Sequence, residues 1–132
     1  MIRDEHFELG RELRRRMFGR AGADDQIEST TELDDKLQDI VTRHVFGDIW
    51  QRPELDVRTR SMITLAMLVA LGRAHEIRIH LRGALANGVT PEEIREIMLH
   101  STIYCGLPAG VDGILAAGEV FAEQGVDTGS AA

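Results

Sequence analysis

The chain has 132 residues, a length typical of one domain, and its 43% hydrophobic residues argue against a disordered protein. A formal net charge of -7 argues against a general nucleic-acid-binding face, so no nucleic-acid partner is expected. The one cysteine, Cys105, excludes an internal disulfide, a CxxC redox pair and a cysteine-based zinc cluster. The N-terminus lacks the apolar stretch of a secretory signal, and the longest apolar run, Met62 to Leu71, is too short to span a bilayer. We therefore expect a soluble cytoplasmic protein with no membrane partner.

The first fifty residues predict one weak helix, one loop and one amphipathic helix. Asp4 to Gly19 carries scattered apolar residues among charges, which indicates a helix or arm outside the core. Residues 19–31 are small and polar, so we expect a loop there, and residues 1–31 together form an N-terminal helix or arm with its loop. From Leu33 to about Trp50 the apolar residues recur every three or four positions, as on an amphipathic helix that Pro53 ends.

The rest of the chain predicts four more helices. Val57 to Leu71 is apolar on nearly all sides and should be the most buried element. A helical period follows from Arg73 to Asn87, where Gly88 fits a left-handed C-terminal cap. Thr90 to Glu93 has the threonine, proline and glutamate of a capping box, and Pro108 opens a last helix before a flexible tail over residues 125–132. The prediction is an all-α fold of about six helices in a single domain over residues 1–132.

Arginine provides fourteen of the fifteen basic residues, and Lys36 is the single lysine. Codon bias is one explanation. The other is chemical, because the planar guanidinium donates two parallel hydrogen bonds to a carboxylate. If the protein binds a small anion, the place to look is the middle of the chain, which holds Arg52, Arg58, Arg60, Arg73, Arg78 and Arg82.

Arg73, Glu76 and His80 stand at positions i, i+3 and i+7 of one predicted helix, so their side chains share one stripe. A carboxylate one turn before a histidine can fix its tautomer and raise its basicity for proton transfer. The alternative is a solvated helix face. The stripe follows the most apolar helix, and this context favours the functional interpretation.

Four other residues have ordinary structural interpretations beside functional ones. His44 either faces the same cavity or packs around Trp50, and Trp50 either walls a pocket or fills the core. For His100 we expect a core or interface histidine, and for Cys105 a half-buried structural thiol. The five histidines show no HExxH pattern, so no protein metal site is expected.

The chain resembles the carboxymuconolactone decarboxylase family over roughly residues 7–124. The resemblance depends on two long stretches, in order, FGDIWQRPELDVRTRSMITLAML and LGRAHEIRIHLRGALANGVTPEEIREIMLHSTIYCGLPAG. Alkylhydroperoxidases of the same superfamily carry a CxxC pair followed three residues later by a histidine. Laid on this chain, that pattern places its histidine at His80 and its two cysteines at Arg73 and Glu76, so the redox pair is absent.

The resemblance implies a cofactor-free, all-helical enzyme that decarboxylates γ-carboxymuconolactone to β-ketoadipate enol-lactone in protocatechuate catabolism. It further implies a homo-oligomer, a hexamer or a trimer, acting on a small anionic lactone. We assign proton transfer to His80, oriented by Glu76. Two alternatives stay open: a paralogue that binds a small carboxylate without this activity, and a single-cysteine redox protein. The predicted substrate-binding residues are Arg73, Arg58, Arg60, His44 and Trp50.

Overall fold

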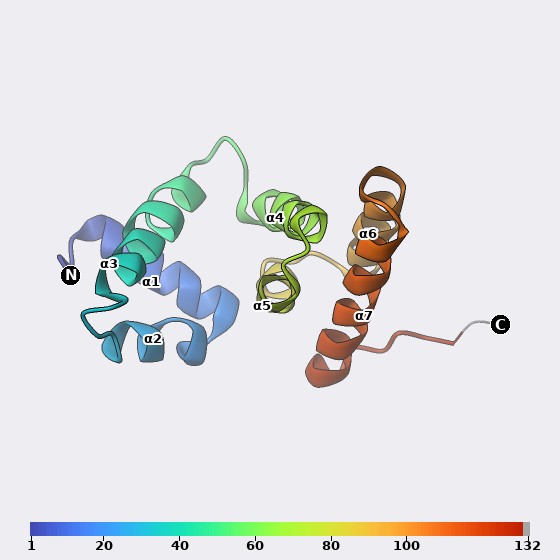
Figure 1. The fold of residues 1–132 in the computed structure, drawn as a ribbon. Helices are drawn as coiled ribbons and strands as arrows, with labels where there is room; N and C mark the ends of the chain where they lie inside the picture. The colour runs from blue at the N-terminus through green and yellow to red at the C-terminus, as the bar shows by residue number, and fades with distance from the viewer. Residues whose placement is uncertain (131–132) are drawn as a thin grey trace. The chain divides into compact units, whose positions relative to one another are not determined.

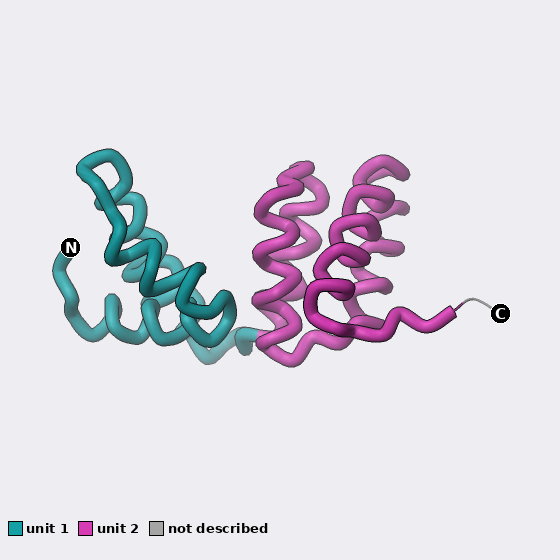
Figure 2. Tube along the Cα trace, turned by 90° about the horizontal axis from the view of Figure 1, so that it is seen from below, with its two compact units in different colours: residues 1–57 teal, residues 58–132 magenta. Residues whose placement is uncertain are grey.

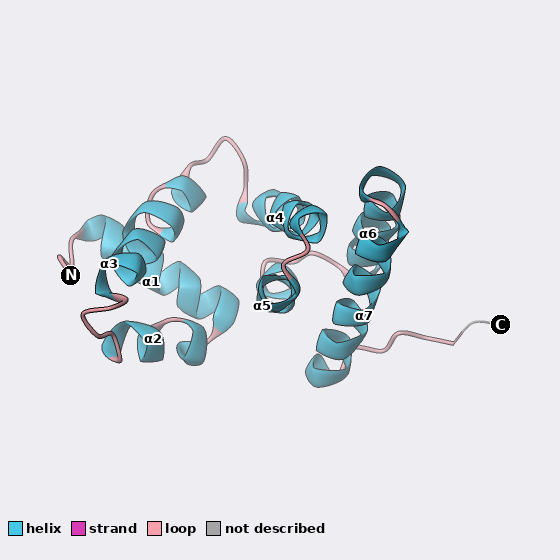
Figure 3. Cartoon of the chain, in the orientation of Figure 1, coloured by secondary structure: helices cyan, strands magenta, loops and turns pink. Residues whose placement is uncertain are grey.

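The computed structural model describes residues 1–130, and over that range the chain is helical with no strand (Figure 3). The predicted all-α class is therefore confirmed. In chain order (Figure 1) the elements are α1 Glu5–Phe18, η1 Arg20–Gly22, α2 Asp24–Glu28, α3 Asp35–Asp39, η2 Ile40–Phe46, η3 Ile49–Gln51, α4 Val57–Leu71, α5 Ala74–Ala86, α6 Pro91–Cys105 and α7 Leu107–Gln124.

The chain divides into two compact units, residues 1–57 and residues 58–132 (Figure 2). The first unit contains the elements from α1 to η3. The second contains α4, apart from its first residue, and all of α5, α6 and α7. Each unit has its own buried cluster, so each is described by itself below.

Helix α1 is a core element of the first unit, and the expectation of an arm outside the core was wrong. Its residues Leu13 and Met17 are buried in one cluster with Phe46 and Trp50. The Phe46 and Trp50 ring centroids lie 5.2 Å apart. The sequence did not predict this role because α1 is rich in charged residues. Only a narrow apolar stripe of the helix packs against the rest of the unit.

A glycine lets the backbone of α1 approach the backbone of η2. A Cβ atom on Gly10 would lie 1.7 Å from the carbonyl oxygen of Thr42, a distance that no side chain can adopt. A Cβ on Gly47 would likewise lie 2.0 Å from the carbonyl oxygen of His6. The two segments are therefore in backbone contact at two points, and this contact docks α1.

A buried arginine adds polar contacts between α1 and the segments that follow. Arg14 is only 3% exposed. Its guanidinium donates over 2.9 Å to Gln38 Oε1, Thr42 Oγ1 and the Gly22 carbonyl oxygen, and over 3.1 Å to Gln26 Oε1. Burial lowers the pKa of Arg14, and the nearby charge of Asp24 opposes that shift. Its hydrogen bonds are what make the buried cation tolerable.

Residues 19–31 are not the continuous loop that their composition predicted. They contain η1 and the short helix α2, whose Ile27 is buried. Asp24 at the start of α2 is also buried, and its carboxylate accepts two 2.7 Å hydrogen bonds from the Arg15 guanidinium. This segment is ordered by ionic and polar contacts to α1, which a hydrophobic pattern does not reveal.

The amphipathic helix expected from Leu33 to Trp50 is broken into α3, the π-helix η2 and the short 3₁₀ helix η3. Leu33 is 95% exposed, and Leu37 also faces solvent, so the regular apolar stripe does not form the buried face. The buried positions of α3 and η2 are instead Asp39, Thr42 and Phe46. The wider turn of a π-helix changes which residues face α1, so an α-helical period predicts the wrong face here.

In the second unit, one apolar cluster joins all four helices. It contains Leu65 and Val69 of α4 together with Ile77 and Leu81 of α5 and residues of α6 and α7. Only one face of α4 is covered, and Met67 and Leu71 are more than half exposed. The expectation that α4 is the most buried element is therefore wrong for the single chain.

The helix ends of the second unit agree with their sequence signals. Thr90 Oγ1 accepts a hydrogen bond from the Glu93 amide and Glu93 Oε1 accepts one from the Thr90 amide, which confirms the capping box. Gly88 has a φ of 89° and follows α5, as expected for a left-handed cap. The predicted tail began at residue 125. Gly125 is the left-handed C-cap of α7, residues 126–130 have no regular structure, and residues 131–132 lie outside the described residues.

Candidate functional site

The predicted stripe lies on α5, which begins directly after a tight turn. Arg73 is the N-cap of this helix and is exposed, as is Glu76 in its first turn. His80 is half-buried, and its Nδ1 atom is inaccessible to solvent. The stripe therefore runs from an exposed cation through an exposed carboxylate to a partly buried imidazole.

Two effects act on the pKa of His80 in opposite directions. Burial lowers this pKa, because a charged imidazolium loses solvation, and the charge of Glu76 raises it by a smaller amount. The predicted influence of Glu76 on the basicity of His80 is present, but burial outweighs it. The net pKa lies below its ordinary value near 6.5, so the imidazole is neutral near pH 7.

The arginines of the middle region fall into different roles. Arg58 of α4 pairs with Glu93 of α6 and donates to the Gly88 carbonyl oxygen over 3.3 Å. Arg78 and Arg82 of α5 instead pair with acidic residues of α7, Glu119 at 2.5 Å and Glu123 at 2.8 Å. Arg60 is half-buried on α4.

Three of the six arginines are therefore engaged in ion pairs between helices of the second unit. This use explains part of the arginine content of the region without a ligand.

His44 and Trp50 belong to the first unit, whereas the other predicted site residues belong to the second. His44 is exposed on the π-helix η2. Trp50 is buried and packs against Phe46, so it fills the core of the first unit, the structural alternative considered for it. Within the second unit, the structure brings Arg73, Glu76 and His80 onto one helix.

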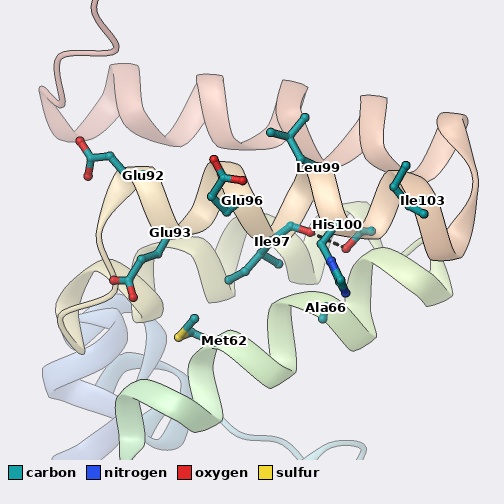
Figure 4. A pocket seen from close by; sticks show the side chains of 10 residues that line it. Met62, Ala66, Glu92, Glu93, Glu96, Ile97, Leu99, His100 and Ile103 are labelled. Atoms are coloured by element: carbon teal, nitrogen blue, oxygen red, sulfur yellow. Dashed lines mark hydrogen bonds between the residues drawn. The ribbon is translucent and has the colours of Figure 1, made fainter.

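A groove that the sequence did not predict lies between α4 and α6 (Figure 4). Its volume is about 660 Å³. Apolar side chains and His100 line one part of it, and the carboxylates of α6 line another. The complete lining is Met62, Ala66, Glu92, Glu93, Glu96, Ile97, Leu99, His100, Ser101 and Ile103.

The groove does not include the α5 stripe, and its three carboxylates disfavour an anionic ligand. His100 is exposed there with its ring centroid 4.8 Å from that of Tyr104. Of the two expectations for His100, a core histidine was wrong, and an interface histidine stays a prediction. Glu92, Glu96 and His100 follow one another at intervals of four residues. This spacing could have predicted that they share one face of α6.

Cys105 ends α6 and is exposed, so the expectation of a half-buried thiol was wrong. Within residues 1–130 the structure contains no cluster of three or more histidine, cysteine, aspartate or glutamate side chains arranged for a metal ion. Among the described helices, none has the length and apolar character needed to cross a membrane.

Comparison with known proteins agrees with the resemblance seen in the sequence. The family model described as "Carboxymuconolactone decarboxylase family" matches residues 35–119. The chain is 37% identical to a 4-carboxymuconolactone decarboxylase of Acinetobacter baylyi over 93% of this chain and 92% of that protein. It is also 34% identical to the nitrosuccinic acid decarboxylase npaB of Metarhizium robertsii, over 83% of this chain and 76% of that protein. These similarities support a decarboxylase function.

Proposed function

Because the chain belongs to the carboxymuconolactone decarboxylase family, we propose that it decarboxylates γ-carboxymuconolactone to β-ketoadipate enol-lactone without a cofactor. The name of the Acinetobacter baylyi relative supports this substrate. The observation that carries the proposal is the α5 stripe, in which a partly buried, neutral His80 follows Glu76 by one turn and Arg73 by two.

The substrate can take up the electrons of its own decarboxylation. Its ring carboxylate stands next to a double bond that is conjugated with the lactone carbonyl. When the carbon–carbon bond to this carboxylate breaks, CO2 leaves and the electron pair moves through the double bond onto the carbonyl oxygen. The resulting dienolate then needs one proton at carbon to become the enol-lactone.

The α5 residues suit the steps that remain. Arg73 is exposed at the helix start, where its guanidinium can hold a substrate carboxylate through two hydrogen bonds. His80 delivers the proton to carbon. Its imidazole is neutral in the free site, and the negative charge of a bound substrate favours the protonated form that the transfer requires. Glu76 supports the same form through its charge.

Arg60 and Arg58 are both candidates for a second carboxylate contact, and Arg58 also pairs with Glu93. Arg58 and His44 stay among the proposed substrate-binding residues, whereas Trp50 is assigned to the core of the first unit.

The central experiment replaces the stripe one residue at a time and measures decarboxylation of γ-carboxymuconolactone. His80→Ala should lower kcat by roughly 10²- to 10⁴-fold, the usual contribution of a positioned acid or base. Glu76→Gln should cause a smaller loss. Arg73→Ala should raise KM more than it lowers kcat, because it removes binding common to ground and transition states.

His75→Ala is the matched control, since His75 is an exposed histidine on another side of the same helix. Its activity should equal that of the unmodified protein. Nitrosuccinic acid serves as the comparison substrate, because it also carries a carboxylate near an electron-withdrawing group. A correctly folded His80→Ala protein with unchanged turnover would contradict the assignment.

We also propose that the protein is a homo-oligomer, a hexamer or a trimer. Single chains rarely expose large contiguous apolar patches, yet three helices of the second unit carry exposed large apolar residues. Light scattering should therefore give the mass of a trimer or a hexamer of this chain. A monomer at micromolar concentration would contradict the proposal. The residues concerned are Ile63, Met67 and Leu71 of α4, Leu99, Ile103 and Tyr104 of α6, and Leu107, Val111, Ile114 and Leu115 of α7.

A further inference from the structure

Ser61 of α4 and Asn87, the C-cap of α5, form a polar pair that the proposed chemistry does not use. The Asn87 side-chain Nδ2 donates a hydrogen bond of 3.0 Å to Ser61 Oγ. Ser61 is fully buried, and Asn87 is half-buried. A buried polar side chain is costly without a partner, so this hydrogen bond fixes where the end of α5 lies on α4.

The opposite end of the α4–α5 hairpin is fixed by a second directional contact. Gly72 has a φ of 69°, in the left-handed region, and turns the chain from one helix into the next. The Arg73 amide then donates to the Leu68 carbonyl oxygen over 3.1 Å. Between the two ends, Leu65 and Val69 of α4 and Ile77 and Leu81 of α5 belong to one buried apolar cluster, and apolar contacts are non-directional. The two polar contacts therefore contribute directional restraints to the alignment of α5 on α4.

His80 lies midway between these two ends. It follows Arg73 by seven residues and precedes Asn87 by seven, and seven residues are almost two full turns. Arg73, His80 and Asn87 consequently share one stripe of α5. We propose that Ser61 and Asn87 are a positioning pair, whose hydrogen bond holds α5 against α4 so that His80 stays in its productive place. This inference rests on the proposed function, in which His80 is the proton donor.

The test compares Ser61→Ala, Asn87→Ala and the double variant in the full-length protein. Because a misplacement of about 1 Å can cost about 10²-fold in rate, each single variant should lower kcat by roughly 10- to 100-fold. KM should change by less than about threefold, since substrate binding is retained. The double variant should be no slower than the slower single variant, because both changes remove the same hydrogen bond.

Ser101→Ala is the matched control. Ser101 is also a buried serine, but its hydroxyl donates to the Ile97 carbonyl oxygen within its own helix, over 2.7 Å. It should keep the kcat of the unmodified protein. If Ser61→Ala fails to fold, Asn87→Ala still tests the pair, because Asn87 is less buried than Ser61.

An NMR titration of the histidine side chains without substrate separates this inference from the proposed function. A looser hairpin exposes His80, so its pKa should rise toward the ordinary value in Ser61→Ala and Asn87→Ala and stay unchanged in Ser101→Ala. A protein inactive on the lactone would overturn the proposed function, while the titration would still test the positioning pair. Folded single variants with unchanged kcat and unchanged His80 titration would overturn the positioning role.

Discussion

The two units of this chain are stabilised in different ways. In the second unit a single apolar cluster joins four regular helices, and ion pairs lie at its surface. In the first unit the apolar cluster is smaller, and backbone contact at Gly10 together with the buried Arg14 holds irregular helices against α1. Close contacts and polar bonds are sensitive to geometry, whereas apolar burial tolerates small shifts. The first unit should therefore respond more sharply to small substitutions.

The largest difference between the units is expected from adding one methyl group to a helical glycine. Gly10→Ala places a Cβ against the Thr42 carbonyl oxygen, and backbone atoms cannot yield as a side chain would. We expect a loss of more than about 3 kcal/mol in the free energy of unfolding, measured by urea denaturation.

The matched control is Gly118→Ala in α7, where a Cβ would meet nothing within 4 Å. Alanine is the better helix former, so this variant should be unchanged or more stable by about 0.5–1 kcal/mol. Equal effects of the two substitutions would contradict the contrast between the units.

A smaller effect is expected from removing the cap of α6 in the second unit. Thr90→Ala removes the hydroxyl that accepts from the Glu93 amide, and it should cost about 1 kcal/mol of unfolding free energy. Thr90→Ser keeps the hydroxyl and should restore most of the loss. A loss as large as that of Gly10→Ala would show that the second unit is no more tolerant than the first.

The smallest effect is a pH dependence expected from the first unit. The hydrogen bonds from Arg15 lower the pKa of Asp24 to about 2, below the value near 3.8 expected in the unfolded chain. The stability from this carboxylate is therefore complete above pH 3.8 and disappears as the pH falls through about 2. The Tm difference between the unmodified protein and Asp24→Asn should shrink over this interval.

Arg15→Gln, which removes the donor, is the control for this pH dependence. Its Tm difference from the unmodified protein should shrink over the same interval. A difference that stays constant down to pH 2 would show that the Asp24–Arg15 pair does not contribute to the stability of the first unit.

The contrast between the units also explains which parts of the fold could be predicted. The boundaries of α5 and α6 follow from local signals, the helical period and the Thr90 capping box, and these were predicted closely. The docking of α1 depends on Arg14 and Thr42, which are 28 positions apart in the sequence, and no local pattern encodes that contact. The π-helix was missed because the apolar residues of this segment were assigned to an α-helix with a period of 3.6 residues.

The candidate site was predicted only in part, for the same reason. The spacing of Arg73, Glu76 and His80 sets their common stripe, because three- and seven-residue separations are fixed by helix geometry. The direction of the His80 pKa depends on burial, and burial comes from packing beyond the helix. The Ser61–Asn87 bond and the groove beside α6 both depend on how α4 packs, which the spacing of residues within one helix cannot indicate.

Arg14 has a consequence for how the first unit acquires its order. Its guanidinium reaches acceptors spread from Gly22 to Thr42, a stretch that contributes few large apolar side chains of its own to the core. Those segments make few apolar contacts with one another. Their common hydrogen-bond donor is Arg14, which belongs to α1. A shortened form of the protein that begins after α1 would thus lose more than one helix. Residues 22–42 would also lose the Arg14 hydrogen bonds that hold them in place.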